Sequence, residues 1–221
     1  MYILLEIAII LVVLFLAWLF IGNGIDKLKN PSEWSDAGKS GERAVYIALR
    51  DEFHVPEKQM LRNVYIPTKT GKTSEIDLLV VSRRGLLVFE CKNYSGNIYG
   101  DARYKNWIQY VGSKKNYFYN PLRQNESHVK HLRDFLGNHR EIPIIPMVIT
   151  TRKGNWKVKN CRPNDYLLGY NCHLKDILEQ LPDSDYMCRH FHTIMNKLAP
   201  LSRPDESIRK RHIENTKKIQ K

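Results

Sequence analysis

The stretch that decides the fold is EIDLLVVSRRGLLVFECKNYSG, residues 75–96. Two runs rich in apolar and β-branched residues, 75–81 and 86–92, stand on either side of a turn at Arg84-Gly85. Short apolar runs bounded by turn residues are typical of β-strands. The stretch therefore predicts two neighbouring strands of a sheet.

Charged residues interrupt both runs. Side chains of a strand alternate between its two faces, so Glu90 and Lys92 should share a face while Cys91 enters the opposite layer. Asp77 is the charged residue among the apolar neighbours of the first run. The two strands therefore present two carboxylates and one ammonium group together.

This grouping indicates a chemistry as well as a structure. Two adjacent carboxylates raise each other's pKa unless a cation joins them, and carboxylate oxygens with water are the natural ligands of Mg²⁺. A bound metal polarises a phosphate oxygen, and Lys92 can stabilise the charge that develops there. The alternative is a structural ion pair between Glu90 and Lys92, with Asp77 capping a turn.

The rest of the chain favours one α/β domain over residues 38–200. Apolar periodicity predicts further strands at 63–67 and 144–151, and helices at 40–52, 124–136, 173–181 and 187–198. No internal repeat, zinc finger or basic zipper is present in the sequence.

Residues 2–21, YILLEIAIILVVLFLAWLFI, form an apolar run with Glu6 as its one charge. About 20 such residues cross a bilayer as a helix, so segment 1–21 is predicted to be a transmembrane anchor. A cleaved signal peptide is the alternative, but no basic leader precedes the run. A polar linker follows at 22–37, and its lysines place the domain in the cytoplasm by the positive-inside rule. We expect a single-pass protein of the cell membrane.

The chain carries a net charge of +12, which suggests a polyanionic partner. A basic protein without such a ligand is the alternative. The tail at 201–221 is basic and is expected to be a solvated helix or disordered, with a possible contact to anionic lipid. The four cysteines include no CxxC pair, so zinc binding is not favoured. His128 and His131, three residues apart, are more consistent with structural or exposed histidines than with metal ligands.

Five motifs occur in an order that resembles the nuclease-related domain family, often called NERD, which itself resembles the PD-(D/E)XK endonuclease fold. They are Gly38-Lys39-Ser40-Gly41-Glu42, Glu75-Ile76-Asp77, Phe89-Glu90-Cys91-Lys92-Asn93-Tyr94-Ser95-Gly96, Trp107, and Asn120-Pro121 followed by Gln124. The resemblance covers 38–136, about half of the chain. Glu75-Ile76 stands where the proline of the superfamily name is found, a position that varies.

The resemblance implies a restriction-endonuclease-like mixed sheet flanked by helices, and it implies roles for particular residues. Glu42, Asp77 and Glu90 would hold Mg²⁺ or Mn²⁺, Lys92 would be the catalytic lysine, and Gln124 would face the site from a helix. A first-turn carboxylate and a surface amide are the ordinary alternatives for Glu42 and Gln124.

Aromatic and basic residues cluster after the motif, as in proteins that stack bases and neutralise phosphates. The expected nucleic-acid contacts are Asn93, Tyr94, Arg103, Lys105, Trp107 and Arg123. Core or surface roles are the alternative for half of them.

The sequence thus predicts a membrane-anchored, metal-dependent nuclease-type domain that hydrolyses phosphodiester bonds of nucleic acid, DNA more than RNA. Two hypotheses of other classes stay open. One is a nucleic-acid-binding module that does not cut, and the other is a signalling module tethered at the membrane.

Overall fold

The computed structural model describes residues 37–151, 154–162, 165–168, 174–202, 207, 208, 210 and 212. Within that part of the chain, no helix combines the length and the apolar character needed to cross a bilayer. The predicted anchor (1–21), nearly all of the predicted linker and most of the basic tail lie outside the described residues.

A five-stranded mixed sheet, sheet A, forms the centre of the fold in the order β1-β2-β3-β7-β9. β1, β2 and β3 pair antiparallel, whereas β3, β7 and β9 run parallel. The strands are β1 (Met60–Pro67), β2 (Thr73–Ser82), β3 (Gly85–Lys92), β7 (Ile144–Thr150) and β9 (Tyr166–Leu168). The predicted α/β class is therefore confirmed, and four of these strands match predicted ones.

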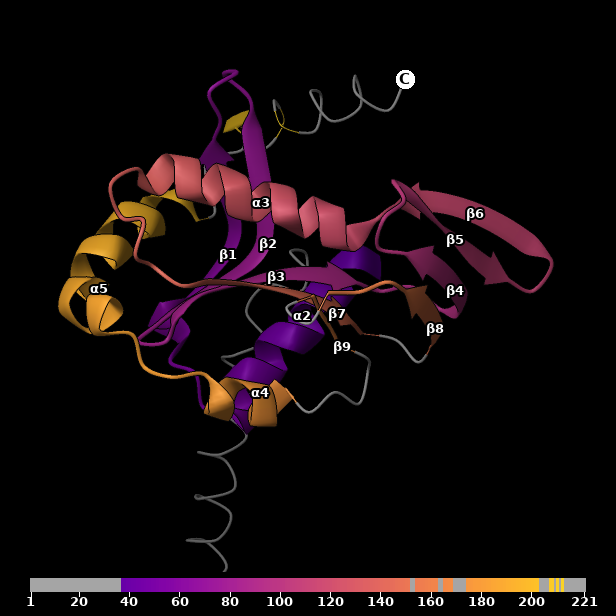
Figure 1. The fold of residues 1–221 in the computed structure, drawn as a ribbon, viewed down its shortest axis with the longest axis horizontal. Helices are drawn as coiled ribbons and strands as arrows, with labels where there is room; N and C mark the ends of the chain where they lie inside the picture. Colours follow the sequence, from indigo (N-terminus) through magenta and orange to yellow (C-terminus); the bar gives the residue numbers. More distant parts are fainter. Residues whose placement is uncertain are drawn as a thin grey trace, which may run out of the picture.

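Helices cover both faces of sheet A (Figure 1). One face carries α3 (Pro121–Leu136) and α5 (Asp185–Leu198). The other carries α2 (Ala37–Ile47), which continues as a π-helical turn η3 (Ala48–Glu52), and α4 (Leu174–Gln180). The chain also forms two short 3₁₀ turns, η4 (Glu57–Gln59) and η5 (Ala199–Leu201).

The alternation of β3 explains this three-layer arrangement. Leu86 and Val88 pack toward α3 and α5, whereas Leu87 and Phe89 pack toward α2 and α4. All four side chains are buried, and burying one such side chain contributes about 1.5–3 kcal/mol. A strand that is apolar on both faces needs a helical layer on each side.

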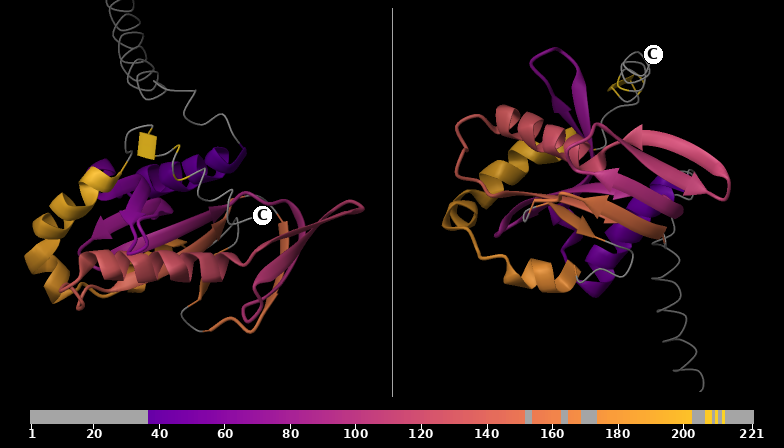
Figure 2. Two further views of the ribbon diagram at one scale, coloured as in Figure 1. Left: turned by 90° about the horizontal axis from the view of Figure 1, so that it is seen from above. Right: turned by 45° about the vertical axis from the view of Figure 1, so that its right-hand side comes forward.

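A second sheet, sheet B, comes directly after β3 and extends away from the central layers (Figure 2). Its order is β6-β5-β4-β8, from strands β4 (Gly96–Asp101), β5 (Asn106–Val111), β6 (Lys114–Tyr119) and β8 (Gly154–Lys159). Ile98 and Trp107 of its inner face pack with Leu122 of α3 and Val148 of β7. None of these four strands is predicted by the apolar pattern of the sequence.

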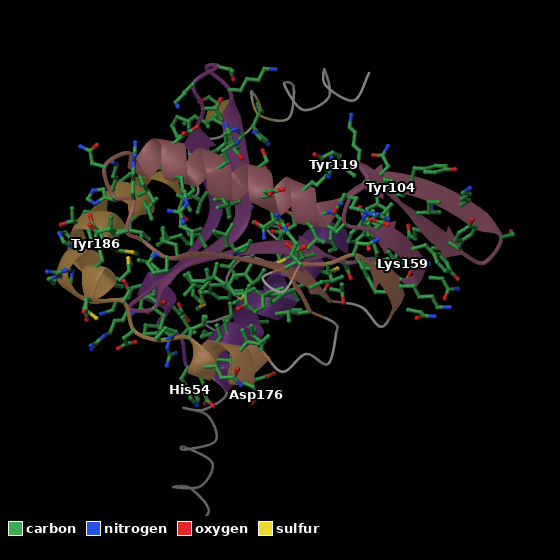
Figure 3. The ribbon with its side chains drawn as sticks, in the orientation of Figure 1. His54, Tyr104, Tyr119, Lys159, Asp176 and Tyr186 are labelled. Atoms are coloured by element: carbon green, nitrogen blue, oxygen red, sulfur yellow. The ribbon has the colours of Figure 1, made fainter. Side chains whose placement is uncertain are left out.

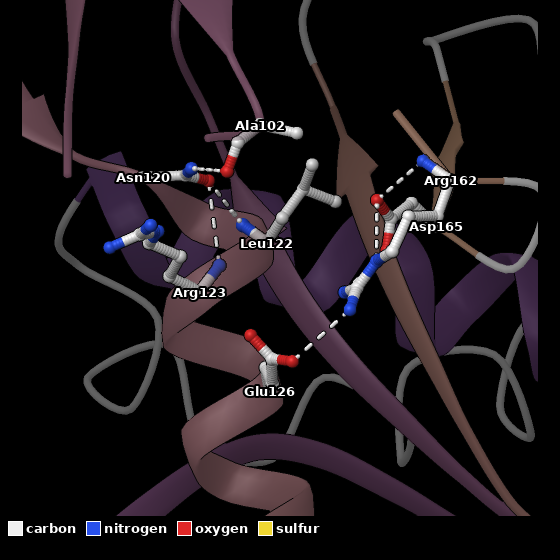
Figure 4. A network of polar contacts seen from close by, with 7 residues as sticks. All are labelled: Ala102, Asn120, Leu122, Arg123, Glu126, Arg162 and Asp165. Atoms are coloured by element: carbon white, nitrogen blue, oxygen red, sulfur yellow. Dashed lines mark hydrogen bonds and ion pairs between the residues drawn. The ribbon is translucent and has the colours of Figure 1, made fainter. Parts of the chain in front are cut away.

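The start of α3 is fixed to sheet B by a buried asparagine. Asn120 Oδ1 accepts hydrogen bonds from the backbone N–H groups of Leu122 and Arg123, and its Nδ2 donates to Ala102 O, 3.1 Å away (Figure 4). An N-cap asparagine followed by proline is a strong helix start. The helix therefore begins at Pro121, three residues before the predicted start.

Gly96, at the junction of the two sheets, should tolerate no side chain. Its φ is +81°, and a Cβ there would collide with the carbonyl oxygen of Tyr110. Gly71 has a similar φ of +75° but open space around it. Gly71→Ala should cost about 1 kcal/mol from backbone strain alone, and Gly96→Ala should cost at least about 2 kcal/mol. Urea unfolding of both variants measures the difference, and equal losses would contradict the predicted collision.

Candidate active site

Asp77 lies where the regular alternation of β2 breaks. Ile76 and Leu79, three residues apart, both pack toward α3 and α5, whereas Leu78 between them packs toward α2 and α4. On the neighbouring strand, Asn63 has a left-handed φ of +47°, a conformation that asparagine adopts more readily than most residues. Beside Asp77, both strands therefore switch which of their side chains, those at odd or at even positions, face α3 and α5.

The Asp77 carboxylate continues the hydrogen bonding between β2 and β3. The backbone ladder ends at the pair Leu78–Phe89, and Asp77 Oδ2 then accepts a hydrogen bond of 2.8 Å from the backbone N–H of Cys91. Burial, with the negative charges of Glu90 and Glu42, holds the pKa of Asp77 well above its ordinary value. The site thus concentrates negative charge around Asp77.

Glu90 and Lys92 lie on the same face of β3, as predicted, and they form a buried ion pair. Glu90 is 1% exposed, and its Oε1 lies 2.6 Å from Lys92 Nζ. Burial alone would raise the pKa of Glu90, but Lys92 and His128 outweigh it and hold that pKa below its ordinary value. Burial would likewise lower the pKa of Lys92, but Glu90 and Asp77 hold it above its ordinary value. At neutral pH the pair is therefore carboxylate and ammonium.

Helix α3 supplies the remaining groups. Lys92 Nζ donates to Gln124 Oε1 at 3.2 Å, which brings the predicted glutamine into the site. Next to it, Asn125 Nδ2 donates to Val88 O at 2.9 Å and to Met147 O at 3.1 Å. This buried amide fixes the helix over β3 and β7.

His128, one turn after Gln124, is a site residue that the sequence analysis assigned as structural or exposed; it is buried. Its Nδ1 lies 2.8 Å from Ser74 Oγ, and its Nε2 lies 3.2 Å from Glu90 Oε2. These last two atoms are not aligned for a hydrogen bond, so Glu90 Oε2 is a buried oxygen without a hydrogen-bond partner. The i, i+4 spacing from Gln124 was the signal that could have identified His128.

Glu42 approaches the site from the other side of the sheet, on α2. Burial raises the pKa of both Asp77 and Cys91, and the charge of Glu42 adds to this effect. The preceding Gly41 lets α2 come close, because a Cβ there would meet Thr151 Oγ1 and Asn93 Cβ. Asn93 Nδ2 also donates to Ser40 Oγ at 2.9 Å. The helix start is thus fixed beside the end of β3.

Two carboxylates at the site are suitable ligands for a hard divalent cation. No three His, Cys, Asp or Glu side chains among the described residues converge as a ligand set. The pKa of the Asp77 carboxyl is nevertheless raised, and Glu90 has a buried carboxylate oxygen, Oε2, that makes no hydrogen bond. Mg²⁺ is commonly held by one or two carboxylates with water completing its shell. These two residues satisfy that requirement, with Glu42 as a neighbouring charge.

The predicted nucleic-acid contacts divide into two groups. Trp107 is 1% exposed and donates from Nε1 to Asp101 O, and Tyr94 is half-buried against Phe118. Both side chains belong to the apolar layer on the inner face of sheet B. The expectation that Trp107 offers a surface for bases was therefore wrong. Asn93 is held between α2 and β7 by Ser40 and Thr151.

Arg103, Lys105 and Arg123 are exposed as expected. Arg103 and Arg123 line a cleft of about 920 Å³ along α3. Its charges are largely paired, since Arg103 lies 2.8 Å from Asp101 and Arg162 contacts both Glu126 and Asp165 (Figure 4). Cys161 and Cys188 are exposed free thiols, and Cys172 lies outside the described residues.

Comparison with known proteins agrees with this geometry. The sequence model of the nuclease-related domain family matches residues 37–151, which is more than half of the chain. The chain is also 30% identical over 190 residues to an uncharacterised protein from Bacillus anthracis, covering 84% of this chain and 85% of that protein. No solved structure matches it significantly. The chain therefore belongs to the nuclease-related domain family, and the predicted resemblance is confirmed.

Replacing Asp77 by asparagine should stabilise the protein. The raised pKa means that folding favours the protonated carboxyl, so the wild type should lose stability relative to Asp77→Asn as the pH rises above the ordinary pKa of aspartate. At pH 7.5 the gain should be about 1–2 kcal/mol. Asp134, whose pKa is lowered chiefly by its hydrogen bond from Lys69, is the matched control, and Asp134→Asn should give no gain. Denaturant unfolding at several pH values measures both, and a wild type that gains stability relative to Asp77→Asn as the pH rises would contradict the assignment.

Proposed function

We propose that this member of the nuclease-related domain family is a metal-dependent nuclease that hydrolyses phosphodiester bonds of nucleic acid. The observation that carries the proposal is the buried Glu90–Lys92 pair beside Asp77. A buried ion pair gives little net stability, and a carboxylate whose pKa is raised by folding lowers the stability of the protein. Costly groups gathered at one place are typical of a functional site.

The side chains divide the proposed chemistry among them. Asp77 and Glu90 would hold Mg²⁺ or Mn²⁺, with Glu42 adding negative charge nearby. Such an ion, when bound, supplies Lewis-acid polarisation of the phosphate and a water of lowered pKa. Because the pKa of Lys92 lies above its ordinary value, Lys92 acts as a cation that stabilises charge on the phosphate.

Two residues of α3 position the others. Gln124 accepts a hydrogen bond from Lys92 Nζ and thereby limits where the ammonium group can lie. His128, held by Ser74, stands beside Glu90 Oε2 and keeps bulk water from that oxygen. We therefore assign Gln124 as a positioning residue for the lysine, and His128 as one for the carboxylate.

The finer parts of the proposal rest on the sequence. Sheet A with its helices on both faces is consistent with a restriction-endonuclease-like core. The apolar segment 1–21 is proposed to anchor the chain in the cell membrane with the domain in the cytoplasm, where the basic tail would meet anionic lipid. The net charge of +12 supports a nucleic acid as substrate, and we expect DNA more than RNA.

A second candidate function has one observation in its favour. Among the described residues, the acidic side chains do not converge as a three-residue ligand set, and Lys92 contacts the carboxylate that would bind a metal. A module that binds nucleic acid without cutting it would retain such a pair as a structural contact. Cleavage and metal binding separate the two functions.

Cleavage should depend on Asp77, Glu90 and Lys92. The full-length chain in mild detergent is incubated with single-stranded DNA, duplex DNA or RNA, with Mg²⁺, Mn²⁺ or EDTA. Asp77→Asn, Glu90→Gln and Lys92→Met should each reduce cleavage by roughly 10²–10³-fold, and EDTA should abolish it. Lys58→Met, at an exposed lysine of η4, is the matched control and should cleave as the wild type does. Cleavage that survives the three substitutions in folded protein would overturn the assigned site.

Metal binding should also be visible without activity. Mg²⁺ at about 100 times its dissociation constant should stabilise the wild type by about 2.7 kcal/mol. Thermal unfolding at constant ionic strength, with Na⁺ replacing Mg²⁺ as the control, measures the shift in Tm. The shift should disappear in Asp77→Asn and Glu90→Gln. An equal shift in all three proteins would show that the ion binds elsewhere, and no shift in any would favour the non-cutting module.

A further inference from the structure

Sheet B has two chemically different faces. Its inner face carries Ile98, Trp107 and other apolar residues. Directly opposite residues of a sheet point to the same side, and the register places Tyr99 beside Lys157 and Tyr110 beside Lys115. The outer face therefore bears six residues that we call the tyrosine–lysine face: Tyr99, Tyr110, Lys115, Tyr117, Lys157 and Lys159.

These side chains form a row across all four strands. Lys157 Nζ of β8 lies 5.5 Å from the Tyr99 ring, and the rings of Tyr99 and Tyr110 are 5.8 Å apart, edge to face. Lys115 Nζ of β6 lies 6.0 Å from the Tyr110 ring and 4.9 Å from the Tyr117 ring. With strands about 4.8 Å apart, the row spans about 14 Å.

The row is open to solvent. Tyr99 is 41% exposed and Tyr117 is 66% exposed, and the three lysines are exposed as well. Figure 3 places Lys159 of β8 and Tyr119 of β6, the two edge strands of sheet B, at the opposite end of the molecule from Tyr186 of α5. Aromatic rings gathered on a surface, without a core to pack into, are typical of an interaction site.

The charge of this face is positive. Asp101 is the acidic residue of sheet B among its described strands, and Arg103 and Asn160 contact its carboxylate at 2.8 Å and 2.7 Å. Within those strands, Lys115, Lys157 and Lys159 therefore have no further acidic side chain to neutralise them. A polyanion with flat rings is complementary to this surface.

We propose that the tyrosine–lysine face binds single-stranded nucleic acid, whose bases stack on the tyrosines and whose phosphates meet the lysines. Base–aromatic stacking needs unpaired bases, so a duplex would not satisfy the face. An anionic membrane would also meet the lysines, and its headgroup region accepts tyrosine rings, but it offers no flat rings for them to stack on. Single-stranded nucleic acid is therefore the occupant that gives the tyrosines a stacking partner and the lysines a phosphate.

The face would deliver its ligand near the proposed catalytic strand. β4 begins at Gly96, four residues after Lys92, and Gln109 Nε2 of β5 donates to Ser95 O at 2.9 Å in that short connection. The proposal deepens the proposed nuclease function by naming a single-stranded substrate, and it rests on that function only for the cleavage of a strand already bound. Binding itself is independent of the metal site.

Binding is measured under conditions that prevent cleavage. Full-length protein in mild detergent with EDTA is titrated into a fluorescein-labelled 20-nucleotide single strand, and into the duplex of the same sequence, with anisotropy as the readout. Tyr99→Ala and Tyr117→Ala should each weaken single-strand binding roughly 5- to 100-fold. Tyr117→Phe keeps the ring and should bind within about 2-fold of the wild type.

The lysines are tested through the salt dependence. For single strands the slope of log K against log salt changes by about 0.7 per phosphate contact. Lys115→Gln together with Lys157→Gln should therefore reduce the slope by about 1.4. Lys58→Gln removes one charge from η4, outside sheet B, and should leave the slope unchanged.

Three results would overturn the proposal. The first two are tyrosine variants that bind the single strand as the wild type does, and a duplex that is bound as tightly as the single strand. The third is found by titrating phosphatidylserine vesicles in parallel: tyrosine variants that lose binding to the vesicles but not to the single strand. The outcome is separable from the catalytic one, because Asp77→Asn should bind the single strand normally. If the wild type does not cleave nucleic acid but Tyr117→Ala weakens its binding to the single strand, the binding proposal holds and the nuclease proposal fails.

Discussion

The burial of Glu90 is the constraint on which the rest of the structure depends. A carboxylate that is 1% exposed must have a cation and polar neighbours, or it would not stay ionised. Lys92 supplies the cation from the same face of β3, and α3 supplies Gln124 and His128. Removing one partner of such a pair is costly, whereas replacing both by apolar groups is often neutral. An apolar core of similar stability was therefore open to this fold, which supports the proposed chemical role of the pair.

The parts of the fold that the sequence predicted are those in which local pattern and tertiary burial agree. β3 is apolar on both faces and bounded by Gly85, so its period and its ends are readable. The spacing of Glu90 and Lys92 placed them on one face, and their contact at 2.6 Å confirms it. The order of motifs around them identified the family before any geometry was known. Helix α3 was predicted three residues too short, because its start depends on the cap at Asn120.

The parts that were missed depend on contacts between distant segments. β6 exposes most of its residues, so its sequence carries little apolar period, and it is a strand because β5 pairs with it and Trp107 covers the core beneath. The position of Asp77 depends on a change of phase shared by two strands, which no single-strand pattern contains. His128 meets Glu90 from 38 positions along the chain, and only the packing of α3 brings them together. Trp107 was wrongly predicted to be exposed, because an aromatic residue beside basic residues looks the same in the sequence whether it lies on the surface or in the core.

The distribution of charge explains why a second sheet is needed beside the first. Near Asp77, the ammonium group of Lys92 is already neutralised by Glu90, and Glu42 adds further negative charge. In the proposed nuclease, such a site would repel a phosphate backbone unless a divalent cation were bound there. The free energy that draws a polyanion to the protein must then come from cations outside the site, which is where the net charge of +12 has to act. Sheet B, joined to β3 by Asn93-Tyr94-Ser95, holds the three exposed lysines of the tyrosine–lysine face, and Asp101, the acidic residue of its described strands, already contacts Arg103. In the proposed nuclease, attraction and chemistry are thus carried by different sheets, because one surface cannot be positive for binding and negative for holding a metal.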